Sequence, residues 1–362
     1  MAARTNLVIL FGGKSGEHEV SVASAAYIIE TFHKTGSYHL LPVGITKDGR
    51  WFAYEGNIAS MRAGTWLEQG PVFPASLVAD TSKHNLYVER QNLTQSIKVD
   101  CVFPVLHGPN GEDGTIQGML ELAGIPFVGC GMAASALAMD KVFANTIFDH
   151  NQIPGTPWHA ADYAAWRRDK NLALDAVTDG LTYPLFVKPA RGGSSLGITK
   201  VVSREALPSA MEIAFTHDRK VIVEQGVRGR ELEIALLGGY GAPILSPVGE
   251  IIPDREFYDY DSKYEAQSTS QLIVPADIDG ETLKTIRNLA VRAWRALDCY
   301  GMARIDFFLA DDGQVLLNEI NTIPGFVSIS MYPRLLRAAG YRDEEPLEEL
   351  IRLAFQRQES MK

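Results

Sequence analysis

The chain has 362 residues, a length that indicates two or three domains. Hydrophobic residues make up 46% of it, which is typical of a globular protein. Its 34 Lys and Arg against 44 Asp and Glu give a net charge of -10, which argues against a general nucleic-acid or anionic-membrane surface. Three scattered cysteines argue against a disulfide framework or a structural zinc site, and no apolar run is long enough for a signal peptide or a membrane span, so we expect a cytoplasmic protein.

The first part of the chain alternates strands with helices. Strands are predicted over 6–11, 39–45 and 99–106, with helices over 22–33 and 115–124. This alternation predicts a parallel sheet with helices on its faces, here an amino-terminal α/β domain over 1–129. Loops 12–21 and 107–114 follow strand ends, where such sheets bind ligands. Residues 45–98 are predicted to be irregular and hairpin material inserted into this domain, and indicate no chemistry.

The loop "FGGKSG" invites two nucleotide motifs, and both fail. A phosphate-binding P-loop ending at Lys14 requires glycine at position 8, which is Val8. The dinucleotide fingerprint requires glycine where Lys14 stands, which argues against a nicotinamide oxidoreductase. Glu17 follows in the same loop. It either favours the dipole of the next helix or binds a substrate ammonium, and spacing alone does not decide between these interpretations.

A second unit is predicted over 130–224. It begins with one helix over 135–151 that carries Lys141, for which a solvated surface lysine is the ordinary interpretation. In "FVKPARGGSSLG", Lys188 ends an apolar strand and the glycines and serines that follow can offer N–H and hydroxyl donors to an anion. A plain hairpin turn is the alternative. Glu224 ends the last strand of this unit.

The third unit, 225–362, contains a polar and aromatic segment at 256–272, an amphipathic helix with core residues from Leu283 to Leu297, and a hairpin "ARIDFFLADDGQVLLNEIN". Two apolar runs around an Asp-Asp-Gly turn predict antiparallel strands. Side chains alternate along a strand, so Arg304 and Asp306 share one face of the first arm, and Glu319 and Asn321 share one face of the second.

If the register follows the turn, these two faces of the hairpin coincide. Cross-strand neighbours lie roughly 5 Å apart, close enough for Asp306, Glu319 and Asn321 to hold one or two divalent ions. Oxygen ligands favour Mg²⁺ or Mn²⁺ over zinc, and Mg²⁺ commonly completes its shell with substrate phosphates. The alternative is a hairpin edge whose polar residues face water. The flanking apolar run favours the metal site, and the tendency of Mg²⁺ to keep substrate phosphates as ligands then predicts a phosphate-bearing substrate.

Together, the motifs of this chain resemble a known family. "FGGKSGEHEVS", "LHGPNGEDGTIQG", "MDK", "FVKPARGGSSLG", "FYDYDSKY", "ARIDF" and "NEINTIPGF", in this order from Val8 to about Met331, are similar to those of the D-alanine–D-alanine ligases of the ATP-grasp superfamily. The resemblance implies a three-domain ATP-grasp fold, α/β and α+β in class, whose lid loop is 256–272. It also implies ATP as co-substrate, two Mg²⁺ or Mn²⁺ ions per site, D-alanine as substrate, a role in peptidoglycan precursor synthesis and a homodimer.

The resemblance also implies roles for individual residues. Those implied to bind ATP are Lys141, Lys188, Ser194, Ser195, Glu224, Gln225, Glu231 and Lys263, and those implied to bind the metal ions are Asp306, Glu319 and Asn321. The substrate residues are implied to be Glu17, His107, Arg304, Gly325, Ser330 and Met331, and the catalytic residues Glu17, Ser194, Lys263, Tyr264 and Arg304. Glu17 is implied to hold the ammonium of the first D-alanine and to link to Ser194 and Tyr264.

Implied by the same resemblance is a reaction through an acyl phosphate, attacked by the amine of the second D-alanine while Arg304 stabilises the oxyanion. Two positions depart from the family pattern. Gln225 stands where lysine is common, and Met331 stands where leucine is common beside the acceptor. Remaining alternatives are an ATP-grasp ligase with D-lactate or D-serine as acceptor, and a catalytically silent nucleotide-binding module.

Overall fold

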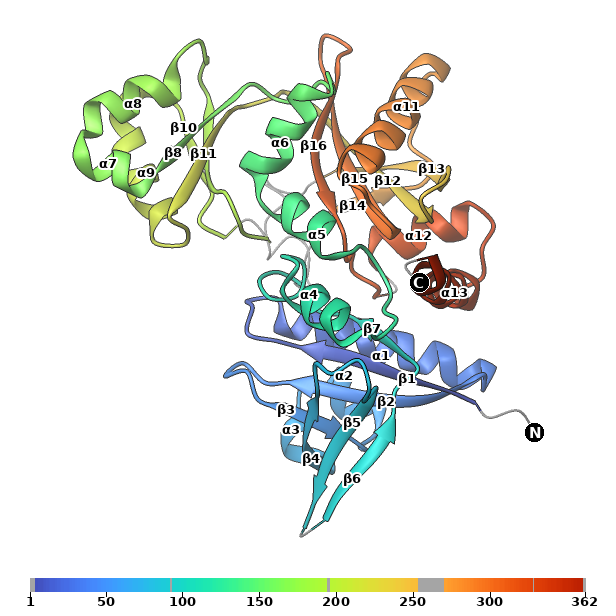
Figure 1. The fold of residues 1–362 in the computed structure, drawn as a ribbon. Coiled ribbons are helices and arrows are strands. Elements are labelled where there is room, and N and C mark those ends of the chain that lie inside the picture. The colour runs from blue at the N-terminus through green and yellow to red at the C-terminus, as the bar shows by residue number, and fades with distance from the viewer. Residues whose placement is uncertain (1–3, 92, 194–195, 253–269, 328, 361–362) are drawn as a thin grey trace.

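The structure is a computed structural model that describes residues 4–91, 93–193, 196–252, 270–327 and 329–360. These form three units, each built on one sheet, with the amino-terminal unit against the carboxy-terminal one and the central unit to one side (Figure 1). This mixed α/β and α+β architecture confirms the predicted fold class. No helix in the described ranges has the length and apolar character needed to cross a membrane.

The amino-terminal sheet has seven strands in the order β6-β5-β4-β3-β2-β1-β7. Its elements are β1 (Thr5–Gly12), α1 (His18–Thr35), β2 (Tyr38–Ile45), β3 (Trp51–Tyr54), α2 (Ile58–Arg62), α3 (Trp66–Gln69), β4 (Val72–Leu77), β5 (Asn85–Arg90), β6 (Leu93–Lys98), β7 (Cys101–Pro104) and α4 (Thr115–Ala123). β1 pairs in parallel with β2 and β7, as the alternation of strands and helices predicts. The segment 45–98 is more regular than predicted, because β3 to β6 extend the same sheet by antiparallel pairing.

Gly12 turns the chain out of β1 toward the loop that carries Glu17. Its φ of 88° lies in the left-handed region, and a Cβ there would stand 2.2 Å from the carbonyl oxygen of Ile45 on β2. Only glycine combines this backbone conformation with so close an approach. The turn therefore brings Glu17, the residue before α1, to the carboxyl edge of the parallel strands.

The central unit has a four-stranded antiparallel sheet in the order β10-β9-β11-β8. Its elements are β8 (Trp158–Asp162), α7 (Tyr163–Arg168), α8 (Lys170–Thr178), β9 (Leu185–Pro189), β10 (Thr199–Val201), η1 (Arg204–Ala206), α9 (Leu207–Phe215) and β11 (Lys220–Gln225). β9 and β11 are neighbours, and their register places Ile222 opposite Lys188. Lys188 and Glu224 are therefore two residues apart along the same face of this ladder.

The carboxy-terminal sheet has the order β14-β13-β12-β15-β16. Its elements are β12 (Gly229–Gly238), β13 (Ile244–Ile252), β14 (Gln271–Ile273), α11 (Gly280–Ala296), β15 (Gly301–Ala310), β16 (Val315–Asn321), α12 (Met331–Ala338) and α13 (Glu344–Ser360). The predicted amphipathic helix is α11, which buries Ile286, Leu289, Ala293 and Trp294. β15 and β16 form the predicted hairpin, with Arg304 opposite Asn321 and Asp306 opposite Glu319.

The helix predicted over 135–151 is interrupted at Asp140. It forms α5 (Met132–Met139) and α6 (Lys141–His150), because Asp140 adopts an extended conformation and accepts hydrogen bonds from the N–H groups of Val142 and Phe143. A carboxylate that caps a helix in this way starts a new one. The break makes Lys141 the first residue of α6 instead of a residue on an exposed helix face.

The packing of these units is not divided as the chain is. Residues of α5 and α6 join the core of the carboxy-terminal sheet, while the central unit has a core of its own. A further core runs from the amino-terminal sheet through α12 and α13 to the carboxy-terminal sheet. The predicted boundaries at 129/130 and 224/225 stay predictions.

Candidate active site

One cavity of about 530 Å³ lies between the three units and gathers the predicted site residues. Those that the structure describes all line it: Glu17, His107, Lys141, Lys188, Glu224, Gln225, Glu231, Arg304, Asp306, Glu319, Asn321, Gly325, Ser330 and Met331. They come from all three sheets and their loops, although they are spread over more than 300 positions of the sequence. The predicted residues Ser194, Ser195, Lys263 and Tyr264 lie outside the described ranges, as does most of the predicted lid, 256–272.

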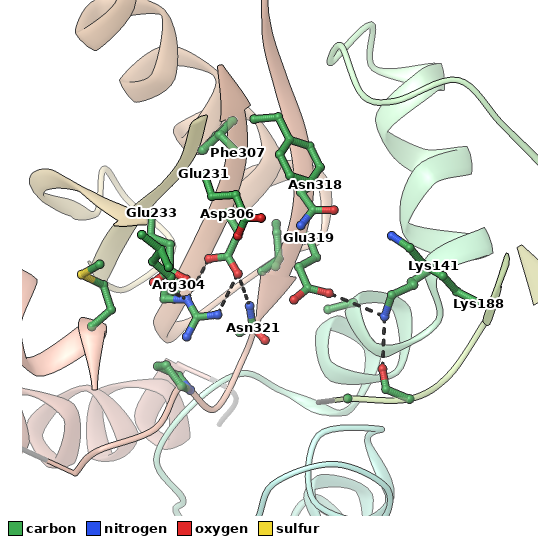
Figure 2. Close-up of a pocket in the computed structure, with 18 of the residues that line it drawn as sticks. Lys141, Lys188, Glu231, Glu233, Arg304, Asp306, Phe307, Asn318, Glu319 and Asn321 are labelled. Atoms are coloured by element: carbon green, nitrogen blue, oxygen red, sulfur yellow. Dashed lines mark hydrogen bonds and ion pairs between the residues drawn. The ribbon is translucent and has the colours of Figure 1, made fainter. Parts of the chain in front are cut away.

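The hairpin supplies the acidic wall of the cavity (Figure 2). Asp306 and Glu319 are direct cross-strand partners, and a bulge follows at once, because Phe307 pairs with Leu317 and leaves Asn318 without a partner in the ladder. A bulge bends its strand and redirects side chains. Asn318 lines the cavity beside Glu319 as a result.

Arg304 is held between two carboxylates. Its Nε and Nη2 donate to Asp306 Oδ1 and Oδ2, both at 2.7 Å, and its Nε is 3.0 Å from Oε2 of Glu233 on β12. Burial acts to lower the pKa of Arg304, but the charges of Asp306 and Glu233 outweigh it and raise this pKa well above its usual value. The guanidinium therefore stays charged at the cavity wall.

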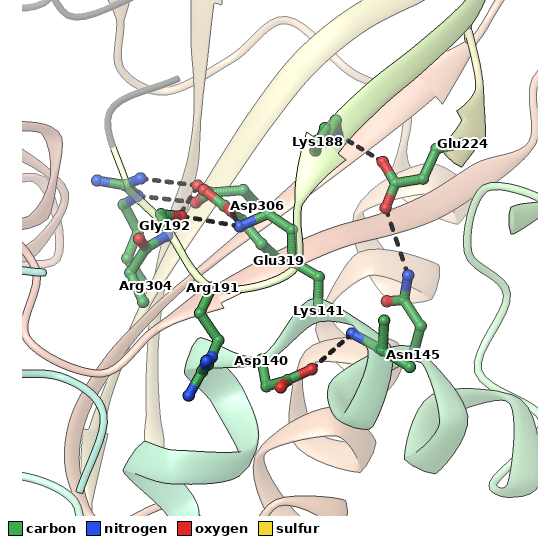
Figure 3. Close-up of polar contacts among 12 residues, drawn as sticks. Asp140, Lys141, Asn145, Lys188, Arg191, Gly192, Glu224, Arg304, Asp306 and Glu319 are labelled. Atoms are coloured by element: carbon green, nitrogen blue, oxygen red, sulfur yellow. Dashed lines mark hydrogen bonds and ion pairs between the residues drawn. The ribbon is translucent and has the colours of Figure 1, made fainter. Parts of the chain in front are cut away.

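The lysines of the opposite wall are also paired (Figure 3). Lys188 Nζ donates to Glu224 Oε2 at 2.5 Å, and Asn145 on α6 donates to the other oxygen of Glu224 at 3.4 Å. Burial acts to lower the pKa of Lys188, and Glu224 reverses this effect and raises it. Lys141 Nζ donates to the carbonyl of Gly192 and lies 3.6 Å from Glu319. Lys141 thus reaches the acidic hairpin itself, while Lys188 is paired with Glu224 on the opposite wall.

A joint of buried polar groups connects loop 107–114 to the segment after β16. His107 Nδ1 donates to the carbonyl of Ile323 at 3.0 Å, and its Nε2 is 3.4 Å from Oγ of Ser24 on α1. Glu112 accepts from the backbone N–H groups of Gly108 at 2.8 Å and Ile323 at 3.2 Å. Loop 107–114 therefore fixes the chain where it leaves the hairpin.

Burial favours the neutral forms of both titratable groups of this joint. Desolvation lowers the pKa of His107. Desolvation, helped by the nearby charge of Glu17, raises the pKa of Glu112 to about 8. The carboxylate of Glu17 lies close by, against Gly108 and against Gly193 of the central glycine loop. Glu17 thus lies where the amino-terminal and central units meet.

Two functional candidates escaped prediction from the sequence. Glu112 belongs to the motif "HGPNGEDG", but nothing in its spacing indicates that it reaches Ile323. Glu233 is two residues after Glu231, so strand alternation already places both on one face of β12. That signal was available, whereas the approach of β12 to Arg304 required the strand order of the sheet.

The donors on the hairpin fit a hard divalent cation. Asp306, Glu319 and Asn321 offer two carboxylates and an amide, a set of oxygen ligands that suits Mg²⁺ or Mn²⁺. Asn321 donates from its amide nitrogen to Asp306 Oδ2 at 3.0 Å, which leaves its amide oxygen for a cation. Among the described residues, no group of three or more His, Cys, Asp or Glu side chains could hold a metal ion.

Comparison with known proteins assigns the class and then the family. Residues 6–130 match the family described as D-ala D-ala ligase N-terminus, and residues 147–352 match D-ala D-ala ligase C-terminus. A D-alanine–D-alanine ligase of Acetivibrio thermocellus is 45% identical over 99% of this chain and 97% of its own length. One of Thermoanaerobacter sp. is 45% identical over 98% of this chain and 97% of its own.

Solved structures agree. The VanG D-Ala:D-Ser ligase from Enterococcus faecalis has a TM-score of 0.87 and 40% identity, covering 97% of this chain and 100% of its own. The D-alanine–D-alanine ligase from Coxiella burnetii has a TM-score of 0.82 and 32% identity, and the match covers 99% of this chain and 96% of that ligase. The chain belongs to the D-alanine–D-alanine ligase family, whose members join two D-alanines with ATP for peptidoglycan synthesis. The predicted family and enzyme class are confirmed.

Proposed function

We propose that this chain joins two D-alanine molecules to D-alanyl-D-alanine in the cavity between its three units, releasing ADP and phosphate. The observation that carries the proposal is the composition of that cavity. Cationic lysines, oxygen donors for a divalent ion and a charged arginine all line one cavity of about 530 Å³. Phosphoryl transfer needs these groups together, because its catalysis rests on positioning and charge stabilisation.

The nucleotide is bound on the central side of the cavity. Glu224, the backbone of Gln225, and Glu231 hold adenine and ribose, while Lys141 and Lys188 contact the phosphates. Their pairing with Glu319 and Glu224 supports this assignment, because a cation already held by a carboxylate is oriented before the substrate arrives. Ser194, Ser195 and Lys263, which lie outside the described ranges, are assigned to ATP by resemblance, and 256–272 is assigned as a lid.

Asp306, Glu319 and Asn321 hold the divalent ions, of which we propose two. Bound there, Mg²⁺ would neutralise charge on the transferring phosphoryl group. Asp306 and Glu319 lie next to each other in this site because they are direct cross-strand partners. Like charges in that arrangement repel each other in the absence of a cation, which favours binding of one.

The amino acids are bound on the amino-terminal side. Glu17 holds the ammonium of the first D-alanine near His107, with Ser194 and Tyr264 assigned by resemblance to the same contact. The carboxylate of the first D-alanine accepts the γ-phosphoryl group of ATP and becomes an acyl phosphate, and ADP leaves. Gly325, Ser330 and Met331 place the second D-alanine, whose amine attacks the acyl carbon. The developing oxyanion is stabilised by Arg304, a kind of contact worth about 3–4 kcal/mol in other enzymes. Phosphate then leaves.

Three further assignments accompany this function. We propose domain boundaries at 129/130 and 224/225, a homodimer and a cytoplasmic location. The separate cores of the central unit and of the carboxy-terminal sheet support the division near 224. Sedimentation velocity tests the dimer, and limited proteolysis tests the boundaries.

Phosphate release from ATP and Mg²⁺ tests the function. The amino acids supplied are D-alanine alone, L-alanine alone, and D-alanine with D-serine or D-lactate, with products identified by mass. Release matched by D-alanyl-D-alanine, absent with L-alanine and lost without Mg²⁺, is expected. A mixed product with D-serine would instead align the chain with the VanG ligase that it resembles in structure. No D-alanine-dependent release from folded, ATP-binding protein would refute the proposal.

A further inference from the structure

Three carboxylates form a row across the carboxy-terminal sheet. Glu233 on β12 pairs with Asp306 on β15, and Asp306 pairs with Glu319 on β16, so all three lie side by side facing the cavity (Figure 2). Like charges directly opposite each other on neighbouring strands are destabilising. Arg304, in the next row of the same face, is the cation that lies against the first two of them.

Asp306 cannot serve Arg304 and a divalent ion equally well. Both of its oxygens accept from Arg304, and Oδ2 also accepts from Asn321. A metal ion that binds those oxygens places positive charge next to the guanidinium and weakens the hydrogen bonds that Arg304 donates to Asp306. Arg304 therefore needs a second anion if it is to remain at the cavity wall when the metal binds.

Glu233 is that anion by position and by burial. Its Oε2 is 3.0 Å from Arg304 Nε, and its side chain is 6% exposed, against 16% for Arg304 and 32% for Glu319. Water screens a buried pair little, so its mutual attraction is strong. The single N–H of Nε is donated to Asp306 in this structure, and Glu233 Oε2 lies 3.0 Å from the same nitrogen, near enough to accept it instead.

We propose that Glu233 is a positioning residue of the ligase: it takes over Arg304 when Asp306 turns to the divalent ion, so that the metal binds at Asp306 and the guanidinium stays directed at the substrate. This inference rests on the proposed function, because it requires a cation at Asp306. In this role Glu233 contacts Arg304, and neither the substrate nor the metal is assigned to it. It acts by relieving the competition between Arg304 and the cation for one carboxylate.

Glu233→Gln tests the inference, since it keeps the shape of the side chain and removes the charge. Mn²⁺ affinity is measured by electron paramagnetic resonance of free Mn²⁺ in the presence of ADP, alongside kcat and KM for ATP. E233Q is expected to weaken Mn²⁺ binding and to lower kcat, each roughly tenfold, the lower end of what loss of a residue behind a metal ligand costs. KM for ATP is expected to stay within about twofold.

Glu250→Gln is the matched control. Glu250 is also a buried glutamate of this sheet with a bidentate arginine partner, Arg230 at 2.7 Å, but neither residue lines the cavity. E250Q is expected to leave Mn²⁺ affinity and kcat within about twofold of wild type. Equal behaviour of E233Q and E250Q would overturn the inference.

A double-mutant cycle separates the proposed role from a direct attraction between Glu233 and the cation. With Arg304→Ala the competition for Asp306 is gone, so adding E233Q is expected to change Mn²⁺ affinity less than about twofold. A tenfold loss that persists in the R304A background means that Glu233 acts on the metal directly, and the inference fails.

Should E233Q unfold, Glu233→Asp decides on the same cycle. E233D keeps the charge but withdraws the carboxylate by one methylene, so a loss of roughly threefold confined to the background with Arg304 supports the inference, and no loss overturns it. Wild-type activity distinguishes the two levels of failure. If the wild type forms D-alanyl-D-alanine and the cycle fails, only the role of Glu233 is wrong; if the wild type forms none, the proposed function is.

Discussion

Two buried polar regions of the same cavity behave in opposite ways. On the hairpin wall, Arg304 lies against Asp306 and Glu233, and across the cavity Lys188 lies against Glu224. In the joint between loop 107–114 and Ile323, His107 and Glu112 form hydrogen bonds with backbone groups, and burial outweighs the charges around them. Burial is comparable in both regions. What differs is whether the opposite charge is strong enough to outweigh the effect of burial.

One fold can thus keep some buried groups ionised and others neutral. Burial always disfavours the charged form, and only an opposite charge or suitable hydrogen bonds reverse that effect. The pKa of Arg304 therefore rises despite burial, while the pKa of Glu112 rises and that of His107 falls because of burial. The charged wall, formed by Arg304 with Asp306 and Glu233, suits phosphate and oxyanion chemistry. The neutral joint, formed by His107 and Glu112, holds the chain in place.

The charged wall is broken most directly by Arg304→Ala. We expect kcat to fall about 10²–10³-fold, the cost of losing one oxyanion donor in other enzymes. Phosphate release with D-alanine measures it. Arg230→Ala, which removes an arginine of the same sheet outside the cavity, is the control and should keep kcat within about threefold. An R304A enzyme as active as R230A would remove Arg304 from the reaction.

Asp306→Asn tests the metal site on the same wall. Losing one carboxylate of the oxygen set is expected to weaken Mn²⁺ binding by about tenfold or more, since ligand charge governs affinity in such sites. Equilibrium dialysis with Mn²⁺ and ADP measures this. Asp311→Asn, at the exposed turn of the same hairpin, should bind as wild type does. Unchanged Mn²⁺ affinity in D306N would place the metal elsewhere.

Glu112→Gln tests the neutral joint through the pH dependence of the protein's stability. The folded state holds the proton of Glu112 up to about pH 8, whereas an unfolded glutamate loses it near its ordinary pKa of 4.5. The stability that this group contributes is therefore complete below about pH 4.5 and is lost as the pH rises through 8. E112Q should remove that decline, which amounts to at most about 1.4 kcal/mol per pH unit.

Urea unfolding between pH 5 and 9 measures the E112Q effect through its slope with pH, because the amide also perturbs two backbone contacts and shifts the absolute value. Glu121→Gln is the control. Glu121 is exposed and likewise accepts a backbone N–H, from Met132. A wild-type and an E112Q curve that stay parallel would show that Glu112 ionises normally in the folded protein.

His107→Gln gives the smallest expected effect and acts on the acid side. The lowered pKa of His107 means that the unfolded chain binds its proton first, so stability is complete above about pH 6.5 and falls as the pH drops below it. H107Q keeps a donor for the carbonyl of Ile323 and should flatten this acid decline. Urea unfolding from pH 7 to 5 measures it, and His39→Gln on the exposed surface should retain the wild-type slope.

Local pattern predicted more of the site than of the packing. The hairpin register that pairs Asp306 with Glu319 follows from alternation and an Asp-Asp-Gly turn, and the structure confirms it. The unbroken helix over 135–151 is wrong, because the cap at Asp140 interrupts an apolar run that otherwise continues in period. The segment 45–98 is predicted to be irregular and hairpin material because its strands are short and partly exposed; its strands pair antiparallel, and they complete the amino-terminal sheet.

By itself, the sequence determined the donors and their local spacing: which carboxylates share a strand face, where a lysine ends a strand, and which motifs follow in the order of the ligase family. These properties depend on a few neighbouring residues and on backbone periodicity. Tertiary structure alone decided which charges are paired. Glu233 reaches Arg304 because β12 lies beside β15, and Glu112 reaches Ile323 because the amino- and carboxy-terminal units share a core. A pKa depends on such neighbours and on burial, neither of which is encoded in any short stretch of chain.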